Sequence, residues 1–287
     1  MSPEFGGDEP DFSGQRDVII LETILSCSAL NFVRNRLSDQ DLMTVTLAAL
    51  PVIKNAGFDY AEIYLREVKE SELGLLLTAA QEQGLKIQSV HYCKPLLKRE
   101  MARSIDLLLR SIAASVFLGA SLGVLHPPAK CGMEASLEIT RKLLDKVLPR
   151  AEEQGIVLTL ENLNGPGYFA LLGKLIEEFP SPSLGITMDL KFLHASGNTM
   201  EEYFRALGTK VVNIHVNEFR GNLVDSRGRR QYPPLGVGEV DFEELSRLIR
   251  QYRYSRVLTL ETCLNEGRER QELARARTLM LGLGKGE

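Results

Sequence analysis

The sequence lacks the features that define several common classes of protein. Its four cysteines are widely spaced and form no CxxC pair, so a disulfide framework is not expected at this size and the thiols are predicted to be reduced. No apolar run reaches the ~18 residues that a membrane-spanning helix needs. The start, MSPEFGGDEPDFSGQ, is polar and rich in Gly and Pro, without the hydrophobic core of a secretory signal. We therefore expect a cytoplasmic protein without a membrane partner, in which residues 1–15 are a disordered or expression-derived segment outside the fold.

The sequence also lacks an excess of positive charge. Lys and Arg number 34 against 38 Asp and Glu, which gives a net charge of -4. An acidic chain gains no long-range attraction to a phosphate backbone, so this balance argues against a nucleic-acid partner. The chain is otherwise ordinary, with 44% hydrophobic and 25% charged residues, which is the profile of a soluble globular protein.

Short β-branched apolar runs alternate with longer stretches of helical spacing from Arg16 onward. The predicted strands are 17–23, 60–65, 86–92, 123–127, 156–162, 185–190, 211–218 and 256–262. The predicted helices are 39–55, 71–83, 98–117, 134–154, 168–178, 241–253, 267–281 and one that begins at the box Thr199-Met200-Glu201-Glu202. Glycines at 57, 84 and 155 are expected to end three of these helices.

This alternation predicts an α/β fold, a single (β/α)8 TIM barrel spanning residues 16–287. The strands read as continuous apolar runs, which is typical of parallel strands covered on both faces. A doubly wound sheet is the alternative, but the stretch after the first predicted strand, ILSCSAL, is not a Gly-rich phosphate-binding turn. The long irregular segment 219–240 follows the seventh strand and is therefore expected at the catalytic face.

Ionisable residues fall at the carboxyl ends of the predicted strands, where a barrel gathers its functional side chains. Glu161 and Glu261 each follow a Leu-Thr-Leu run, and a strand has no need of a carboxylate that is costly to bury. Asp189 and His215 end the strands between them. Three carboxylates and an imidazole without a thiolate predict a site for one divalent cation, with Mn²⁺ as the first expectation and Co²⁺, Mg²⁺ or Zn²⁺ as alternatives. The competing interpretation is a buried network of hydrogen bonds and salt bridges without a metal.

Other residues near the same edge are weaker candidates. His91 and His126 end the third and fourth strands and are either hydrogen-bonded structural histidines or contacts to substrate hydroxyls. Glu62, in the second strand, is expected to form an ion pair inside the barrel or to contact substrate. Arg220 and the RGRR cluster at 227–230 belong either to a solvated loop or to a lid that contacts an anion.

An ordered set of motifs resembles a known family. These motifs are GFDYAEIYL, LGASLGVLHPP, GIVLTLENLNG, LGITMDLKFLHASG, VVNIHVNEFRG, PPLGVGEVDFEEL and VLTLETC, which together lie within residues 50 to 265. They resemble the sugar isomerase/epimerase family with a xylose-isomerase-like TIM barrel, a group that includes ketose 3-epimerases, hydroxypyruvate isomerases and endonuclease IV. The resemblance implies the same four metal ligands, Glu161, Asp189, His215 and Glu261.

The chain departs from this family at two places. A histidine that helps to hold substrate in the epimerases usually follows the sixth-strand Asp by three residues, whereas here Phe192 occupies that place, Lys191 precedes it and His194 comes two residues late. Lys191 and His194 are therefore candidates for substrate binding. Endonuclease IV needs further ligands for its extra metal ions, and the matching loop here reads Arg230-Gln231-Tyr232, which disfavours an abasic-site endonuclease.

The expected activity is proton transfer beside a sugar carbonyl. The resemblance implies that Glu161 and Glu261 move the proton, as base and conjugate acid on opposite faces of a metal-stabilised enediolate. This predicts a metal-dependent isomerase or epimerase of a sugar, sugar acid or sugar phosphate. The alternatives are a lyase that dehydrates a hydroxy-keto acid, as 3-dehydroshikimate dehydratases do, and a sugar-binding barrel without activity. The expected partners are a small carbohydrate or keto acid, together with further copies of the chain in a homodimer or tetramer.

Overall fold

The structure, a computed structural model, describes residues 23–33, 39–94, 100–129, 131–228 and 230–283. The N-terminal segment 1–15 and all of the predicted strand 17–23 except Thr23 lie outside the described residues. Among the described residues, no helix combines the length and the apolar character that would let it cross a bilayer.

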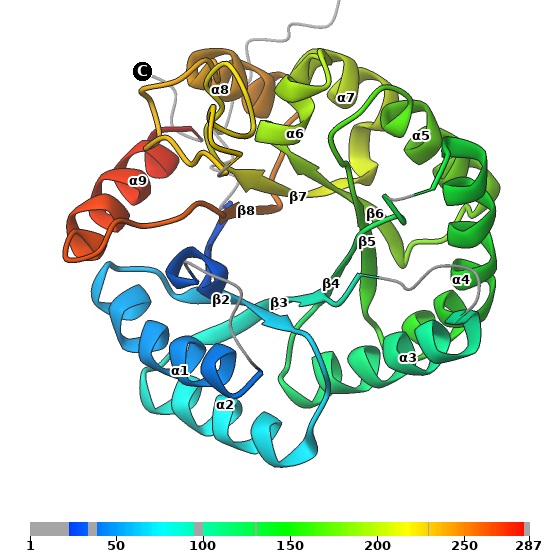
Figure 1. The fold of residues 1–287 in the computed structure, drawn as a ribbon, viewed down its shortest axis with the longest axis horizontal. Helices are drawn as coiled ribbons and strands as arrows, with labels where there is room; N and C mark the ends of the chain where they lie inside the picture. Colours follow the sequence, from blue (N-terminus) through cyan, green and yellow to red (C-terminus); the bar gives the residue numbers. More distant parts are fainter. Residues whose placement is uncertain (1–22, 34–38, 95–99, 130, 229, 284–287) are drawn as a thin grey trace, which may run out of the picture.

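Eight parallel strands form a closed barrel in the order of the sequence, from β1 to β8 and back to β1 (Figure 1). Closure comes from the pairing of β1 with β8, in which Ile24 lies opposite Val257 and Cys27 opposite Leu260. This confirms the predicted (β/α)8 barrel. The strands are β1 Ile24–Ser28, β2 Tyr60–Leu65, β3 Lys86–Tyr92, β4 Leu122–Leu125, β5 Val157–Glu161, β6 Leu184–Asp189, β7 Val211–Val216 and β8 Val257–Leu260.

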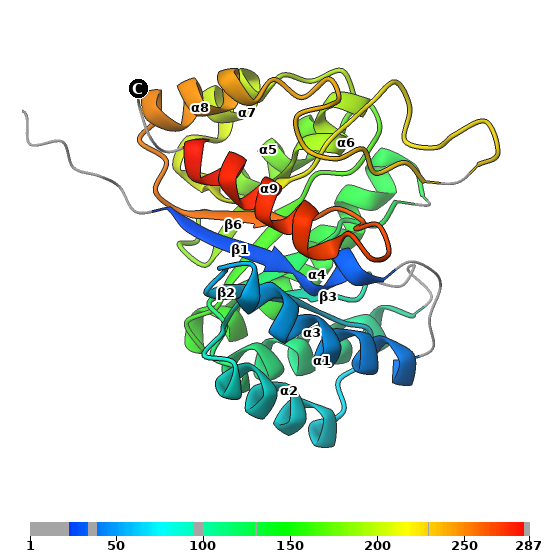
Figure 2. The same cartoon turned by 90° about the vertical axis from the view of Figure 1, so that its left-hand side faces the viewer.

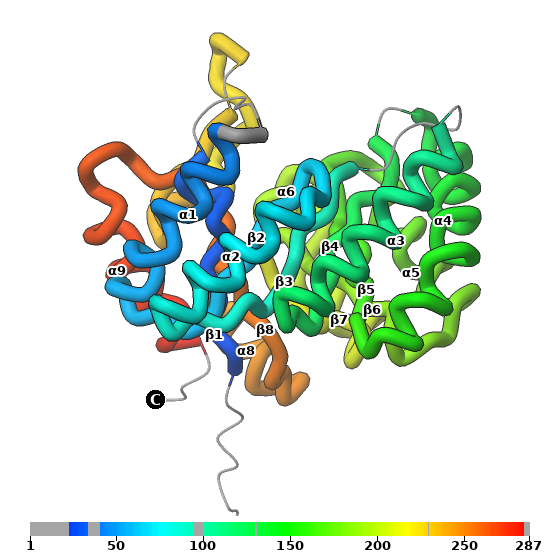
Figure 3. Tube along the Cα trace, turned by 90° about the horizontal axis from the view of Figure 1, so that it is seen from below, coloured from blue at the N-terminus to red at the C-terminus, as the bar shows by residue number. Residues whose placement is uncertain are grey.

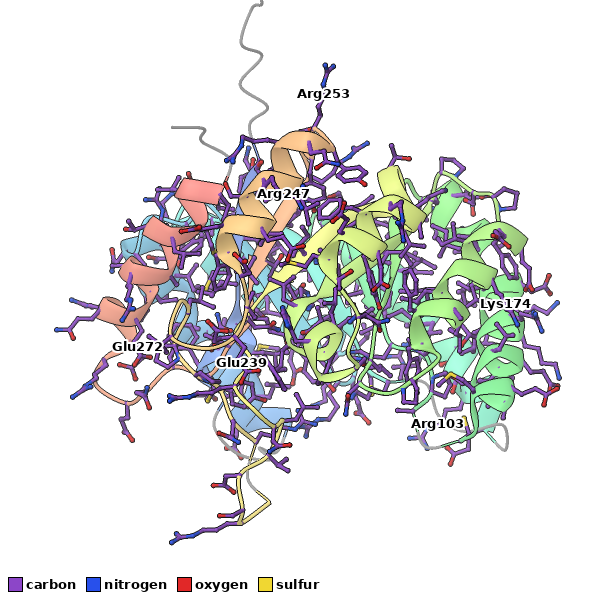
Figure 4. All side chains as sticks on the ribbon, turned by 90° about the horizontal axis from the view of Figure 1, so that it is seen from above. Arg103, Lys174, Glu239, Arg247, Arg253 and Glu272 are labelled. Atoms are coloured by element: carbon purple, nitrogen blue, oxygen red, sulfur yellow. The ribbon has the colours of Figure 1, made fainter. Side chains whose placement is uncertain are left out.

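Helices surround the barrel and cover the outer face of its sheet (Figure 1). Their charged side chains lie on the solvent side, as Lys174 and Arg247 show in Figure 4. The Thr199–Glu202 capping box forms at the start of α7, as predicted. The helices are α1 Asp39–Asn55, α2 Glu70–Glu82, α3 Met101–Phe117, α4 Met133–Glu153, α5 Tyr168–Glu178, α6 Leu190–Ala195, α7 Met200–Leu207, α8 Phe242–Gln251 and α9 Glu269–Leu283, with 3₁₀ turns at Ala29–Phe32 and Gly208–Lys210.

The first strand was predicted too early in the sequence. Thr23 is outside any strand, and β1 is the following stretch, Ile24–Ser28. Its two serines, Ser26 and Ser28, are fully buried. A serine is unusual in an apolar strand, so the more apolar segment DVIILET matched the expected pattern better. The barrel interior nevertheless accepts small polar residues where neighbouring strands also carry them.

The interior of the barrel is polar on the side formed by β5 to β8. Thr159 Oγ1 lies 2.6 Å from Thr187 Oγ1, Asn213 Nδ2 donates to Thr187 Oγ1 at 3.4 Å, and Thr259 Oγ1 donates to Asn213 Oδ1 at 2.9 Å. Each of these residues is buried, and each lies two positions before Glu161, Asp189, His215 or Glu261. Because side chains alternate along a strand, this hydrogen-bonded belt shares the inner face with those four residues and lies directly beneath them.

The long segment 219–240 after β7 projects beyond the barrel at the end toward which the strands point (Figures 2 and 3). Within it, Val224 and Arg230 form an isolated antiparallel bridge. The predicted position of this segment at the carboxyl face of the barrel agrees with the structure.

A packing test follows from Gly123 in β4. A Cβ on Gly123 would overlap the hydroxyl and ring of Tyr92, whose side chain is fully buried and hydrogen-bonded to Ser115 Oγ at 2.8 Å. We expect Gly123→Ala to destabilise the barrel by roughly 1–3 kcal/mol because the ring cannot move aside. Gly173→Ala, in α5 where nothing lies within 4 Å, should instead stabilise by about 0.5–1 kcal/mol. Denaturant unfolding of both variants measures the difference, and equal midpoints would contradict this account.

Candidate functional site

The structure brings Glu161, Asp189, His215 and Glu261 together at the carboxyl end of the barrel. Glu161 and Asp189 are the last residues of β5 and β6, His215 lies in β7 opposite Asp189, and Glu261 directly follows β8. One oxygen or nitrogen atom from each lies within 4.8 Å of the corresponding atoms of the other three. The side chains of Glu161 and His215 are buried, and that of Glu261 is 19% exposed. We call these four residues the acidic ring.

His215 lies between the two glutamates of the acidic ring. Its Nδ1 is 2.5 Å from Glu261 Oε2 and 3.4 Å from Glu161 Oε1. Burial alone would lower the pKa of His215, but Glu261, Glu62 and Glu161 outweigh it and raise that pKa well above its usual value. The site therefore has a strongly negative potential, which a cation would neutralise.

The donor atoms of the acidic ring fit a divalent cation. His215 Nδ1, Glu161 Oε2 and Glu261 Oε2 are buried without a hydrogen-bond partner of acceptable geometry among the described residues. Unpaired buried polar atoms are rare because each one is costly, and a shared ion satisfies all of them at once. Carboxylate oxygens and one imidazole form a donor set suited to Mn²⁺, Co²⁺, Mg²⁺ or Zn²⁺. Glu161, Asp189, His215 and Glu261 are thus the residues that would hold such an ion.

Two asparagines, not anticipated from the sequence, fix Asp189 in place. Asn217 Nδ2 donates to Asp189 Oδ2 at 2.6 Å, and the Phe192 N–H donates to Oδ1 at 2.7 Å. Asn162 pairs with the main chain of Asp189 through bonds of 2.7 and 3.0 Å. Burial raises the pKa of Asp189 to about 7, with Glu161 and Glu261 adding to the rise and Lys191 opposing it. The sequence did contain a signal for these two residues, because Asn162 follows Glu161 by one position and Asn217 follows His215 by two.

Glu62 holds the far side of His215. The Glu62 carboxylate is fully buried, with Oε2 3.3 Å from His215 Nε2 and accepting a hydrogen bond from Ser89 Oγ at 2.8 Å. Burial would raise the pKa of Glu62, but His215 and His91 lower it below its usual value. An ionised Glu62 favours a proton on Nε2 of His215, which leaves Nδ1 to face the acidic ring.

His91 and His126 stack against each other beside Glu161. Their rings are 4.8 Å apart, the two Nε2 atoms are 2.7 Å apart, and His126 Nε2 is 3.0 Å from Glu161 Oε2. Burial lowers the pKa of His126, whereas Glu62 and Glu161 outweigh burial and raise that of His91. These histidines and Glu161 also form a group able to hold an ion. No cysteine belongs to any of the candidate metal groups among the described residues.

The remaining candidates lie around the acidic ring rather than in it. Lys191 is buried, with its ammonium nitrogen 4.7 Å from the ring centre of Tyr232. His194 stacks beside Phe219, with ring centres 6.3 Å apart, and is absent from the candidate metal groups. Arg220 and Arg227 are exposed on segment 219–240.

A closed parallel barrel with helices between its strands is a TIM barrel, and its acids and histidines lie at the carboxyl face, where this fold carries its functional residues. Residues 50–279 match the family of xylose isomerase-like TIM barrels, and the chain belongs to this family. A search of curated proteins found no significant match.

Several solved structures share the fold. The zinc-bound IOLI protein is 18% identical with a TM-score of 0.73, over 91% of this chain and 98% of that one. D-psicose 3-epimerase from Clostridium cellulolyticum H10, solved with D-tagatose, is 14% identical with a TM-score of 0.72, over 92% and 100% of the two chains. The 3-keto-D-glucoside 4-epimerase YcjR from E. coli is 15% identical with a TM-score of 0.68, over 90% and 100%. At these identities the similarity establishes a shared architecture.

The support that Asn217 gives to Asp189 generates a test of the acidic ring. We expect Asn217→Ala to weaken Mn²⁺ binding by about 10- to 100-fold, because outer partners of this kind hold a ligand carboxylate in position. Asn222→Ala, on the exposed loop after β7, is the matched control and should leave the affinity unchanged. Isothermal titration of the metal-depleted protein with MnCl₂ measures both. An unchanged affinity in Asn217→Ala would show that Asp189 does not depend on this contact to bind an ion.

Proposed function

We propose that this protein is a divalent-metal-dependent isomerase or epimerase that moves a proton beside the carbonyl of a sugar, sugar acid or sugar phosphate. The single observation that carries the proposal is the position of Glu161 and Glu261 on either side of His215, at 3.4 and 2.5 Å from the same nitrogen. Two carboxylates at one point provide a base and an acid for the same substrate carbon. The epimerases among the similar structures support this class of reaction.

The chain's own residues have separate roles in this proposal. Burial would raise the pKa of Glu161, but His126 and His215 lower it well below its usual range, so Glu161 is ionised at neutral pH and able to accept a proton. Glu261 also has a lowered pKa, chiefly because His215 outweighs its burial. Asp189 and His215 would hold the ion and transfer no proton. A divalent cation, when bound, supplies Lewis-acid stabilisation of the negative charge that develops on the substrate oxygens.

The stereochemical outcome depends on where the proton returns. If Glu161 removes the proton from one face of the substrate and Glu261 returns one to the opposite face, the product is the epimer. If the proton returns to the neighbouring carbon, the product is the isomer. His126, 3.0 Å from Glu161 Oε2, is placed to orient a substrate hydroxyl near this base, and His91 lies beside it.

The dehydration of a hydroxy-keto acid begins with the same proton removal, and the product separates the two reactions. In the lyase reaction the substrate loses water and becomes a conjugated product that absorbs in the ultraviolet. In the isomerase reaction the atomic composition of the substrate is unchanged. Further parts of the proposal rest on sequence composition and family resemblance: Mn²⁺ as the ion, a cytoplasmic location, a role in carbohydrate metabolism and a homodimeric or tetrameric assembly.

The decisive variant is Glu161→Gln, which keeps the shape of the side chain and removes its basicity. The variant is incubated with Mn²⁺ and a panel of ketoses in D₂O, and NMR measures the rate at which the substrate proton exchanges. We expect this rate to fall by about 10²- to 10⁴-fold. Glu177→Gln, at an exposed position on α5, is the control and should exchange at the rate of the unmodified protein. Thermal unfolding shows whether the barrel is intact in both. Near-normal exchange in a folded Glu161→Gln protein would remove Glu161 from proton transfer.

A further inference from the structure

A buried cation lies next to the acidic ring. Lys191 is the second residue of α6, its backbone N–H donates to Asn217 Oδ1 at 2.7 Å, and the residue is only 6% exposed. Its ammonium nitrogen lies 5.0 Å from the ring centre of Phe192 and 4.7 Å from that of Tyr232. Lys191 is therefore held between two aromatic side chains at the mouth of the barrel.

The ammonium group of Lys191 has no polar partner among the described residues. No acceptor there lies within hydrogen-bond distance of Nζ, and no carboxylate oxygen comes within 4.0 Å of it. An ammonium carries three donors, and the two aromatic faces attract its charge without accepting a conventional hydrogen bond, so the group can still bind an acceptor that enters the mouth. A lysine ammonium has an ordinary pKa of about 10.4, so Lys191 brings a positive charge to this place at neutral pH.

Two further cations approach the same mouth from other loops. Lys94 follows β3. Its pKa is lowered, chiefly by burial and also by Arg230, while Glu161 and Glu261 oppose the change. Arg230 comes from segment 219–240, where it pairs with Val224. Lys94 and Arg230 are both exposed to solvent. Lys94 and Arg230 thus belong to loops that follow β3 and β7, at the same end of the barrel as Lys191, although the chain as a whole is acidic.

Tyr232 is positioned over Lys191 by an anchored loop. Glu218 is buried, and its carboxylate accepts backbone N–H bonds from Phe219 and Val240 at 3.0 Å and from Gly236 at 2.9 Å. These bonds tie the two ends of segment 219–240 together. The aromatic contact to Lys191 is therefore a built feature of the loop and not a chance approach of an exposed side chain.

We propose that the substrate carries an anionic group, a carboxylate or a phosphate, which binds Lys191 at this mouth. This inference rests on the proposed function and names the class of sugar that the site takes. The anion contacts Lys191 beside Tyr232, Lys94 and Arg230 attract it from the rim, and the carbonyl end of the substrate faces the two glutamates. An anionic oxygen neutralises the charge of Lys191 and accepts charge-assisted hydrogen bonds from its ammonium group, whereas a neutral hydroxyl leaves that charge uncompensated. A site built in this way discriminates strongly against the neutral analogue.

The test uses three ketoses that differ at one carbon: D-fructose with a hydroxyl at C6, D-fructuronate with a carboxylate and D-fructose 6-phosphate with a phosphate. Isothermal titration of the Mn²⁺-loaded protein should show at least one of the two anions binding tenfold or more tighter than D-fructose, and the arm that binds identifies carboxylate or phosphate. Lys191→Met should weaken that anion at least tenfold and D-fructose less than threefold. Lys146→Met, at an exposed position on α4, is the control and should change neither.

Failure of the inference and failure of the proposed function give different results. If neither anion binds more tightly than D-fructose, or if Lys191→Met weakens all three ligands equally, the inference is overturned. Proton exchange in D₂O on the same samples reports the proposed function, and an anion preference without exchange would overturn that function alone. If Lys191→Met does not fold, Lys94→Met replaces it, and we expect a threefold or greater loss confined to the anion. An equal effect on all three ligands would again reject the anion site.

Discussion

The constraint on which this structure depends is the burial of several carboxylates at one end of a barrel. Glu161, Asp189 and Glu261 converge on one point, and each would cost several kcal/mol if its charge were left uncompensated there. The neighbouring residues are the response to that cost. Histidines lie between the acids, amides donate to them, and a belt of hydroxyl and amide side chains beneath them replaces an apolar interior. In the proposed function, the same acids would hold the cation and accept the proton.

Rigidity of the site comes from partners outside the acidic ring. Asn217 and the first turn of α6 fix both oxygens of Asp189, and Glu62 fixes the orientation of His215. A ligand whose side chain is already held loses little conformational freedom when an ion or substrate binds. This arrangement also separates tasks, because the residues that orient others need no contact with the reacting atoms.

The sequence predicts the barrel well because short strand-like segments alternate regularly with helical ones, and the observed ends of β2 and β3 match the predicted ones. The four members of the acidic ring could be predicted because an ionisable residue at the carboxyl end of an apolar strand is costly to bury and therefore stands out in the sequence. Other features depend on long-range geometry that local patterns do not contain. Asn162 meets Asp189 across 27 positions, and α6, with six residues, is too short to show a helical period. Strand β1 was misplaced because its serines are favourable only inside this particular barrel.

The Glu218 carboxylate fixes the base of segment 219–240 through hydrogen bonds to the main chain. Its bonds to Phe219, Gly236 and Val240 close the base of the segment with backbone groups only, so they impose no demand on the side chains between residues 222 and 234. The tip can change its length and composition while both of its ends stay fixed relative to the barrel. A base closed in this way would allow the tip of the segment to be exchanged without any change to the acidic ring.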